Sequence, residues 1–164
     1  MIDFTPFQET ARLLYQGPWV AERLAATRPL LERDSEALLP VTRQIIQSGA
    51  KYSATDVFKA LHQLESLRRA SEREWAKMDV LLLPTAGTIY TIEQVEREPV
   101  QLNQNLGYYT NFVNLLGLCA LAAPAGIGRD GLPVGVTFMA PGGADGWLCD
   151  VGRRFLGTEN GAAA

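Results

Sequence analysis

The sequence predicts an α/β fold, with helices in the first half of the chain and a mixed sheet with a late hairpin in the second half. Three observations carry this prediction. Apolar residues recur at helical spacing up to about residue 78, between proline and glycine breaks. A short apolar run at 80–83 ends at Pro84, as a strand does. Two further apolar runs flank the glycine-bounded segment 128–131, which suits a tight reversal.

Proline and glycine divide the first half into separate helices. A first helix is expected over residues 7–15, ending at the turn formed by Gly17 and Pro18. Because proline has a fixed φ and no backbone N–H, it suits the first position of a helix. Pro18, Pro29 and Pro40 are therefore each expected to open a further helix.

The longest helix is expected over residues 53–78. Ser53 and Asp56 have the spacing of a capping box, although aspartate is a shorter partner than glutamate. The apolar stripe that follows repeats at a helical period and indicates packing rather than cofactor binding. Its members are Val57, Leu61, Leu64, Leu67, Trp75 and Met78.

The second half has the pattern of short strands with helices between them. The run at 80–83 is continuous in apolar residues, which predicts a strand buried on both faces. A polar stretch at 85–109 follows it. The remaining elements are expected as a helical turn at 92–98, helices at 111–116 and 144–155, and strands at 118–124 and 134–139.

Length and composition limit the classes of function. A chain of 164 residues with 47% hydrophobic content suits one globular domain, with a disordered tail expected at 157–164. The net charge of −3 argues against nucleic-acid binding. No apolar run is long enough for a membrane span, and no signal-peptide pattern begins the chain. Cys119 and Cys149 are expected as reduced, buried thiols of a cytoplasmic protein, and a disulfide between them is the alternative.

Two features look like functional signatures but have simpler interpretations. Residues 126–131 spell the G-x-G-x-x-G dinucleotide fingerprint, but a strand rather than a helix follows, so a hairpin turn is the better interpretation. His62, the one histidine, lies in mid-helix without a positioned serine or a metal-ligand partner. It is expected as a surface or partly packed residue of the helix, and neither a metal nor a cofactor is predicted.

Tyr15 and Arg23 form a candidate site for a small carboxylate. The Gly17–Pro18 turn reverses the chain between two helices, so the two side chains could face the same space. A phenol offers one hydrogen bond, and a guanidinium offers a planar fork that matches a carboxylate. The alternative is that Tyr15 and Trp19 pack while Arg23 pairs with Glu22 or another surface acid, and spacing alone favours this alternative.

The segment after the strand at 80–83 is a second candidate site. Thr88 and Tyr90 follow the carboxyl end of that strand, where α/β sheets tend to bind ligands. Tyr109 and Asn111 belong to an amide- and hydroxyl-rich segment further on. These side chains could line a polar pocket, or they could satisfy the backbone of a long irregular loop.

Several separated motifs resemble the amidase-signature family, over nearly the whole chain. The general family pattern is found at 79–86, 114–126 and 130–136. Residues 14–23, 87–91 and 109–114 resemble the allophanate hydrolase branch in particular. The resemblance implies that residues 1–156 form the C-terminal portion of an amidase-signature domain.

The resemblance also implies a reaction and a substrate. Allophanate hydrolases cleave the linear amide of allophanate to ammonia and carbon dioxide, in urea degradation. By this resemblance Tyr15 and Arg23 contact the substrate carboxylate, which reverses the preference drawn from spacing. A small carboxylate such as allophanate or malonate is therefore the expected ligand.

The catalytic residues of the family have no match in this sequence. The family uses a serine nucleophile, a second serine in a cis peptide and a lysine base, with the serines in a Gly/Ser-rich stretch. Here the five serines are isolated, so no catalytic residue is assigned and the chain alone is expected to be inactive. The missing N-terminal amidase segment is one expected partner. The alternative is a non-catalytic module that binds a small acid, a partner chain or a second copy of itself.

Overall fold

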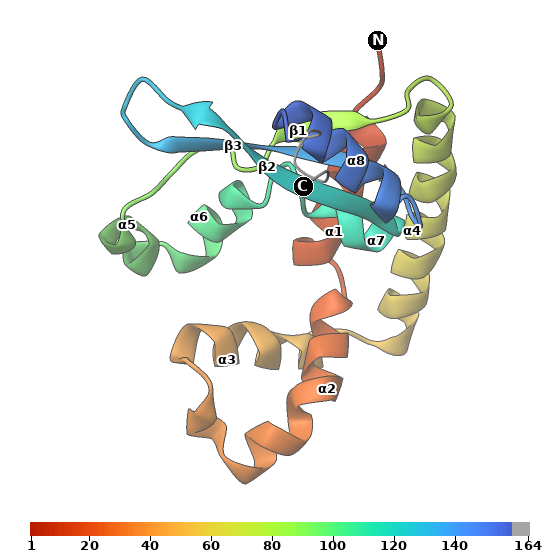
Figure 1. Cartoon of the computed structure of the whole chain (residues 1–164). Coiled ribbons are helices and arrows are strands. Elements are labelled where there is room, and N and C mark those ends of the chain that lie inside the picture. Colours follow the sequence, from red (N-terminus) through yellow and green to blue (C-terminus); the bar gives the residue numbers. More distant parts are fainter. Residues whose placement is uncertain (159–164) are drawn as a thin grey trace.

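A computed structural model describes residues 1–158 (Figure 1). Helices dominate the first half and strands appear late, which confirms the predicted fold class. The elements in chain order are α1 (Thr5–Gln16), α2 (Trp19–Arg33), the 3₁₀ helix η1 (Ser35–Ala37), α3 (Pro40–Gln47), the 3₁₀ helix η2 (Ser48–Lys51), α4 (Ala54–Trp75), β1 (Leu81–Pro84), α5 (Ile92–Arg97), α6 (Pro99–Leu106), α7 (Phe112–Leu116), β2 (Leu118–Ile127), β3 (Pro133–Pro141) and α8 (Asp145–Phe155).

The sheet has the strand order β1-β3-β2, and both of its strand pairs are antiparallel. The expected mixed sheet is therefore wrong for residues 1–158. A mixed sheet would need a parallel pairing of β1, but β1 runs antiparallel to the central strand β3, from Leu81 opposite Met139 to Pro84 opposite Val136. The chain between these two strands is long, so no local turn signal sets the direction of their pairing. The hairpin itself is confirmed. Gly131, with φ of 79°, lies in its turn and donates its N–H to the Gly128 carbonyl at 3.0 Å.

One face of the sheet packs against α1, α4 and α7, around an aromatic cluster. Phe7 of α1 is fully buried, and its ring centroid lies 5.2 Å from that of Phe112 and 6.1 Å from that of Trp75. Leu81 and Met139, which are paired across β1 and β3, complete this core from the sheet side. Residues from both halves of the sequence therefore share one core.

The other face of the sheet is covered by α8, which packs over β2 and β3. Leu148 of α8 and Phe138 of β3 are buried there. This helix does not cover all of β1, since Leu82 is 49% exposed. The prediction of a first strand buried on both faces is therefore wrong, because β1 is an edge strand whose second face is only partly covered.

A helical excursion, defined as residues 19–51, leaves this body after α1 and returns to α4. Figure 1 shows α2 and α3 extending away from the sheet. Its base is a close approach between η2 and α2. A Cβ atom at Gly49 would lie 2.6 Å from the Val20 carbonyl oxygen and 2.9 Å from the Ala21 Cα. Only glycine lets the two backbones meet at this distance.

Three predictions of detail differ from the structure. Pro29 lies inside α2 rather than at the start of a helix. The helix continues through the proline and ends at Arg33, with Asp34 as its C-cap. Cys149 is exposed on the outer face of α8, whereas Cys119 is buried as expected. Residues 99–106 form the helix α6, where a polar stretch without a helix was expected, because four of these eight residues are Gln or Asn.

The start of the long helix follows the expected chemistry. A capping box joins Ser53 and Asp56 at the start of α4, as the sequence predicted. The predicted tail at 157–164 falls largely on residues that lie outside the described ones. The two tail residues that are described cap α8, and the Thr158 N–H donates to the Arg153 carbonyl at 3.0 Å. Within residues 1–158, no helix has the length and apolar character needed to cross a membrane.

Candidate functional site

A polar cavity of about 250 Å³ lies between α1 and α6, and we call it the α1–α6 cavity. Gln8, Arg12 and Tyr15 line it from α1, at positions that share one helix face. The side chains opposite them are mostly carboxamides. They are Gln101, Gln104 and Asn105 of α6, and Tyr108 and Asn111 of the segment that follows.

Hydrogen bonds hold part of this lining in place. Gln8 Nε2 donates to the Tyr108 hydroxyl, across from α1 to the segment after α6. Gln101 Nε2 donates to Asn105 Oδ1 at 3.1 Å, and Asn105 Nδ2 donates to the Tyr90 hydroxyl at 3.0 Å. The loop that carries Tyr90 is thereby tied to the wall of the α1–α6 cavity.

A second, larger cavity of about 1070 Å³ lies between the loop 84–91 and the β2–β3 hairpin. Thr88, Tyr90 and Tyr109 line it. The Tyr109 ring lies against the loop, since a Cβ atom at Gly87 would be 3.2 Å from that ring. The rings of Tyr108 and Tyr109 meet edge to face, with centroids 4.9 Å apart. The two cavities are therefore neighbours that share a wall of tyrosines.

The structure divides the predicted site residues between these cavities. Tyr15 and Asn111 line the α1–α6 cavity, whereas Thr88, Tyr90 and Tyr109 line the loop cavity. Arg23 lines neither cavity and is exposed on α2. The structure thus brings Tyr15 together with Asn111 but does not bring it together with Arg23.

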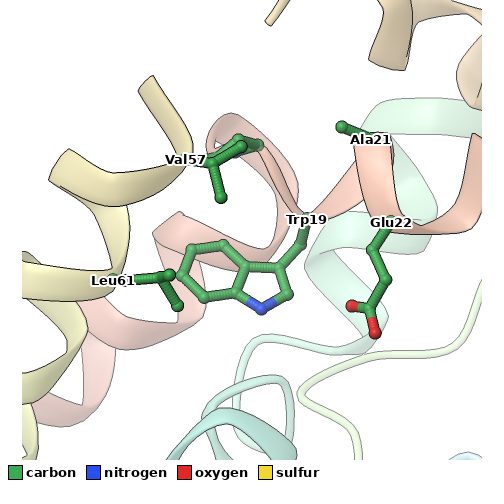
Figure 2. A pocket seen from close by; sticks show the side chains of 6 residues that line it. Trp19, Ala21, Glu22, Val57 and Leu61 are labelled. Atoms are coloured by element: carbon green, nitrogen blue, oxygen red, sulfur yellow. The ribbon is translucent and has the colours of Figure 1, made fainter. Parts of the chain in front are cut away.

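The surroundings of Arg23 test the alternative drawn from spacing. Trp19 packs against the core formed by α1, α4 and α7, as that alternative expected. Within residues 1–158, however, no ion pair joins Arg23 to Glu22. Glu22 instead lines a cavity of about 550 Å³ together with Trp19 and Leu61. Figure 2 shows its carboxylate beside the Trp19 indole and across from Leu61.

Sequence reasoning missed Arg12, the charged side chain of the α1–α6 cavity. Within residues 1–158, no hydrogen bond or ion pair joins the Arg12 guanidinium or the Tyr15 hydroxyl to another residue. Helical spacing was the signal that could have found it, because Arg12 lies one turn before Tyr15 on the same face of a predicted helix.

Residues 15–149 match the Amidase family. The chain belongs to the amidase family. It is 41% identical over 157 residues to the urea amidolyase of Saccharomyces cerevisiae, covering 94% of this chain and 9% of that protein. It is 39% identical over 157 residues to the urea amidolyase of Lachancea kluyveri, with the same 94% and 9% covered.

Solved structures agree with this membership. An allophanate hydrolase from Kluyveromyces lactis superposes with a TM-score of 0.89 at 38% identity, covering 99% of this chain and 27% of that one. The urea amidolyase of the same organism gives 0.90 at 37% identity, covering 99% and 10%. The amidase chain described here thus spans about a quarter or less of each of these relatives.

The serines of this amidase chain lie on or beside helices, and most bond to nearby backbone. Ser48, Ser66 and Ser71 each donate to a backbone carbonyl three or four residues earlier, at 2.6, 3.1 and 2.8 Å. Ser53 caps α4. Ser35 begins η1. No serine of residues 1–158 is hydrogen-bonded to a lysine, and the Ser53 hydroxyl donates to the Asp56 carboxylate at 2.7 Å within the capping box of α4.

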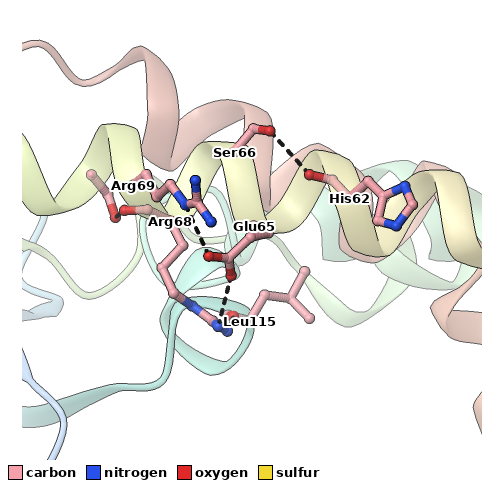
Figure 3. Close-up of polar contacts among 7 residues, drawn as sticks. His62, Glu65, Ser66, Arg68, Arg69 and Leu115 are labelled. Atoms are coloured by element: carbon pink, nitrogen blue, oxygen red, sulfur yellow. Dashed lines mark hydrogen bonds and ion pairs between the residues drawn. The ribbon is translucent and has the colours of Figure 1, made fainter.

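The one histidine of this amidase chain is a surface residue of α4, as predicted. Figure 3 shows its imidazole apart from the polar contacts of that helix, in which Glu65 pairs with Arg68 and Arg69. Arg68 also donates to the Leu115 carbonyl at 3.2 Å and so joins α4 to α7. Within residues 1–158, no group of three His, Cys, Asp or Glu side chains could hold a metal ion.

Proposed function

We propose that this chain forms the substrate-binding portion of an allophanate hydrolase and holds the substrate carboxylate through Tyr15 and Arg23. The observation that carries the proposal is the superposition of almost the whole chain on the Kluyveromyces lactis allophanate hydrolase. The substrate is allophanate, cleaved to ammonia and carbon dioxide in urea degradation.

The polar chemistry of the two side chains supports this role. Tyr15 is 39% exposed and lines the α1–α6 cavity, with its hydroxyl available to a ligand. Arg23 is exposed, and its guanidinium could form the planar double contact that a carboxylate accepts. Thr88, Tyr90 and Tyr109 line the neighbouring loop cavity, and we propose their hydroxyl groups as further contacts of the substrate.

We further propose that the 164 residues alone do not hydrolyse allophanate. The serine hydroxyls that bond to backbone carbonyls are not positioned for attack, and a nucleophile without an adjacent base is weak. Lys77 pairs with Glu74 at 2.8 Å, and Lys51 lies over the Tyr52 ring. The loss of a nucleophile–base unit removes orders of magnitude in rate. The predicted cytoplasmic location stays a prediction from the sequence.

The test is to join this chain to the part of the Kluyveromyces lactis allophanate hydrolase that precedes the matched region. We expect the joined protein, but not the 164 residues alone, to release ammonia from allophanate. In the joined protein, Arg23→Lys should raise KM at least tenfold, since an ammonium cannot form the bidentate contact. Arg28→Lys, also exposed on α2, is the matched control. An unchanged KM in Arg23→Lys would refute the assigned role.

A second candidate is a non-catalytic module that binds a small acid or a partner chain. It is favoured by the outer edges of β1 and β2, which pair with no other strand among residues 1–158. Such edges and exposed apolar side chains favour association, with a partner or with a second copy. Sedimentation of the 164 residues would separate a monomer from an assembly, and calorimetry with malonate would test acid binding.

A further inference from the structure

We infer that the α1–α6 cavity recognises a small carboxylate that carries a carbamoyl group, with Arg12 as a contact of the carboxylate and the carboxamides opposite as contacts of the carbamoyl group. This inference rests on the proposed function and adds residues to it. It assigns the ligand's two ends to two different walls of one cavity.

The charge of the cavity favours an anion. Arg12 is the charged side chain among those that line it, and no Asp or Glu of residues 1–158 lines this cavity. Glu9 lines a neighbouring cavity of about 340 Å³ together with Arg12, but the two form no ion pair within the described residues. The guanidinium is therefore free to take a carboxylate with two parallel hydrogen bonds.

The opposite wall offers both hydrogen-bond donors and acceptors. Gln101 and Asn105 are already engaged with each other and with Tyr90. Gln104 and Asn111 line the same cavity, and their side chains have no hydrogen-bond partner within residues 1–158. A carboxamide has one acceptor oxygen and two donor hydrogens, which is the complement of a carbamoyl group.

Close packing fixes the direction of Asn111. A Cβ atom at Gly107 would lie 2.2 Å from Asn111 Oδ1, so the side chain lies directly over the glycine at the end of α6. The cavity of about 250 Å³ is smaller than the roughly 300–1,000 Å³ of sites for drug-sized ligands. A small acid amide suits it in size as well as in chemistry.

The experiment is calorimetry on the full chain with malonamate, which carries a carboxylate and a carbamoyl group. Malonamide, which lacks the charge, and malonate, which lacks the carbamoyl group, are the comparison ligands. We expect malonamate to bind at least tenfold more tightly than malonamide. Arg12→Gln should weaken malonamate binding at least tenfold, whereas Arg28→Gln should leave it unchanged. Gln104→Met should remove the preference for malonamate over malonate.

Thermal unfolding of each variant establishes that it folds, and Arg12 and Arg28 are both exposed, so neither change should disturb the core. The inference is overturned if malonamate does not bind at millimolar concentration, or if Arg12→Gln binds it as the unchanged chain does. A normal malonamate affinity in Arg12→Gln together with a raised KM in Arg23→Lys would support the proposed function and overturn this inference. A weakened malonamate affinity in Arg12→Gln together with an unchanged KM in Arg23→Lys would place the carboxylate at Arg12 instead of Arg23.

Discussion

The body of the molecule and the helical excursion at 19–51 are built from the same kinds of helix but differ in how much they bury. The body has fully buried aromatic and apolar side chains from α1, α7 and β3, namely Phe7, Phe112 and Met139. The excursion buries few side chains, chiefly Val20, Leu24 and Ile46, each 8–9% exposed. Since helix stability in proteins comes mostly from such packing, the excursion is the less stable region.

This difference bears on the proposed site. Tyr15 and Arg12 stand on α1, which is part of the body, whereas Arg23 stands on the excursion. Gly17 joins the two parts, and a Cβ atom there would lie 2.3 Å from the Leu13 carbonyl oxygen. The position of Arg23 relative to Tyr15 therefore depends on this tight junction and on the packing of Trp19 against the core, while the α1–α6 cavity depends on the body.

The largest effect is expected from Phe7→Ala. The ring is 0% exposed and touches Phe4, Phe112 and Trp75, so its removal leaves a cavity in the body. We expect a loss of about 3–5 kcal/mol in the free energy of unfolding, measured by chemical denaturation. Leu39→Ala, at a side chain 72% exposed in the excursion, should change it by less than about 0.5 kcal/mol. Similar losses in the two variants would remove the contrast between the regions.

A smaller loss in the free energy of unfolding is expected from Gly49→Ala. This change tests whether the excursion can be destabilised at its base without affecting the body. The added methyl group meets backbone of α2 at 2.6 Å, so the contact between η2 and α2 must open. Overpacking of this kind costs about 1–3 kcal/mol. Hydrogen exchange should show the loss in α2, α3 and η2 while α4 keeps its protection.

Gly146→Ala is the matched control for that change. A Cβ atom at Gly146 meets no heavy atom within 4 Å, and the position lies in α8. Alanine is favoured over glycine in a helix by up to about 1 kcal/mol, so this variant should be as stable as the unchanged chain or more stable. If Gly49→Ala matched it, the close approach would have no energetic role.

The sequence predicted most helices and strands because proline, glycine and helical periodicity are local signals. The first helix, α4 with its capping box, and the β2–β3 hairpin were all placed from such signals. The burial of β1 could not be predicted, because it depends on how far α8 reaches over the sheet. Likewise, the direction of its pairing depends on β3, more than 50 residues later in the chain.

The candidate site was predicted in part for the same reason. Tyr15, Tyr90, Tyr109, Thr88 and Asn111 were named from local chemistry, and each of them lines one of two adjacent cavities. Which residues share a cavity is a tertiary fact, since α6 lies opposite α1 only in the folded chain. Arg12 was missed because nothing near it in sequence marks it, apart from its spacing from Tyr15.

The smallest predicted effect on stability comes from the charge of Glu74, which belongs to the body and has no buried counterpart in the excursion at 19–51. Among the buried residues of the described chain, Glu74 of α4 is the charged one, and the excursion has none. Lys77 at 2.8 Å and the Asp3 N–H at 2.9 Å hold the pKa of Glu74 below its ordinary value of 4.5. Because the folded pKa is lowered, Glu74 stabilises the fold above pH 4.5 and loses this contribution as the pH falls further.

Glu74→Gln tests this dependence because glutamine keeps the shape of the side chain without the charge. Between pH 7 and pH 3, the thermal midpoint of the unchanged chain should fall by more than that of Glu74→Gln. Lys77 is 52% exposed, so the ion pair is screened and the difference should be smaller than either loss above. Glu72→Gln, at an exposed position of the same helix, should follow the unchanged chain. Parallel curves for Glu74→Gln and the unchanged chain would show that the carboxylate does not hold the N-terminal segment to α4.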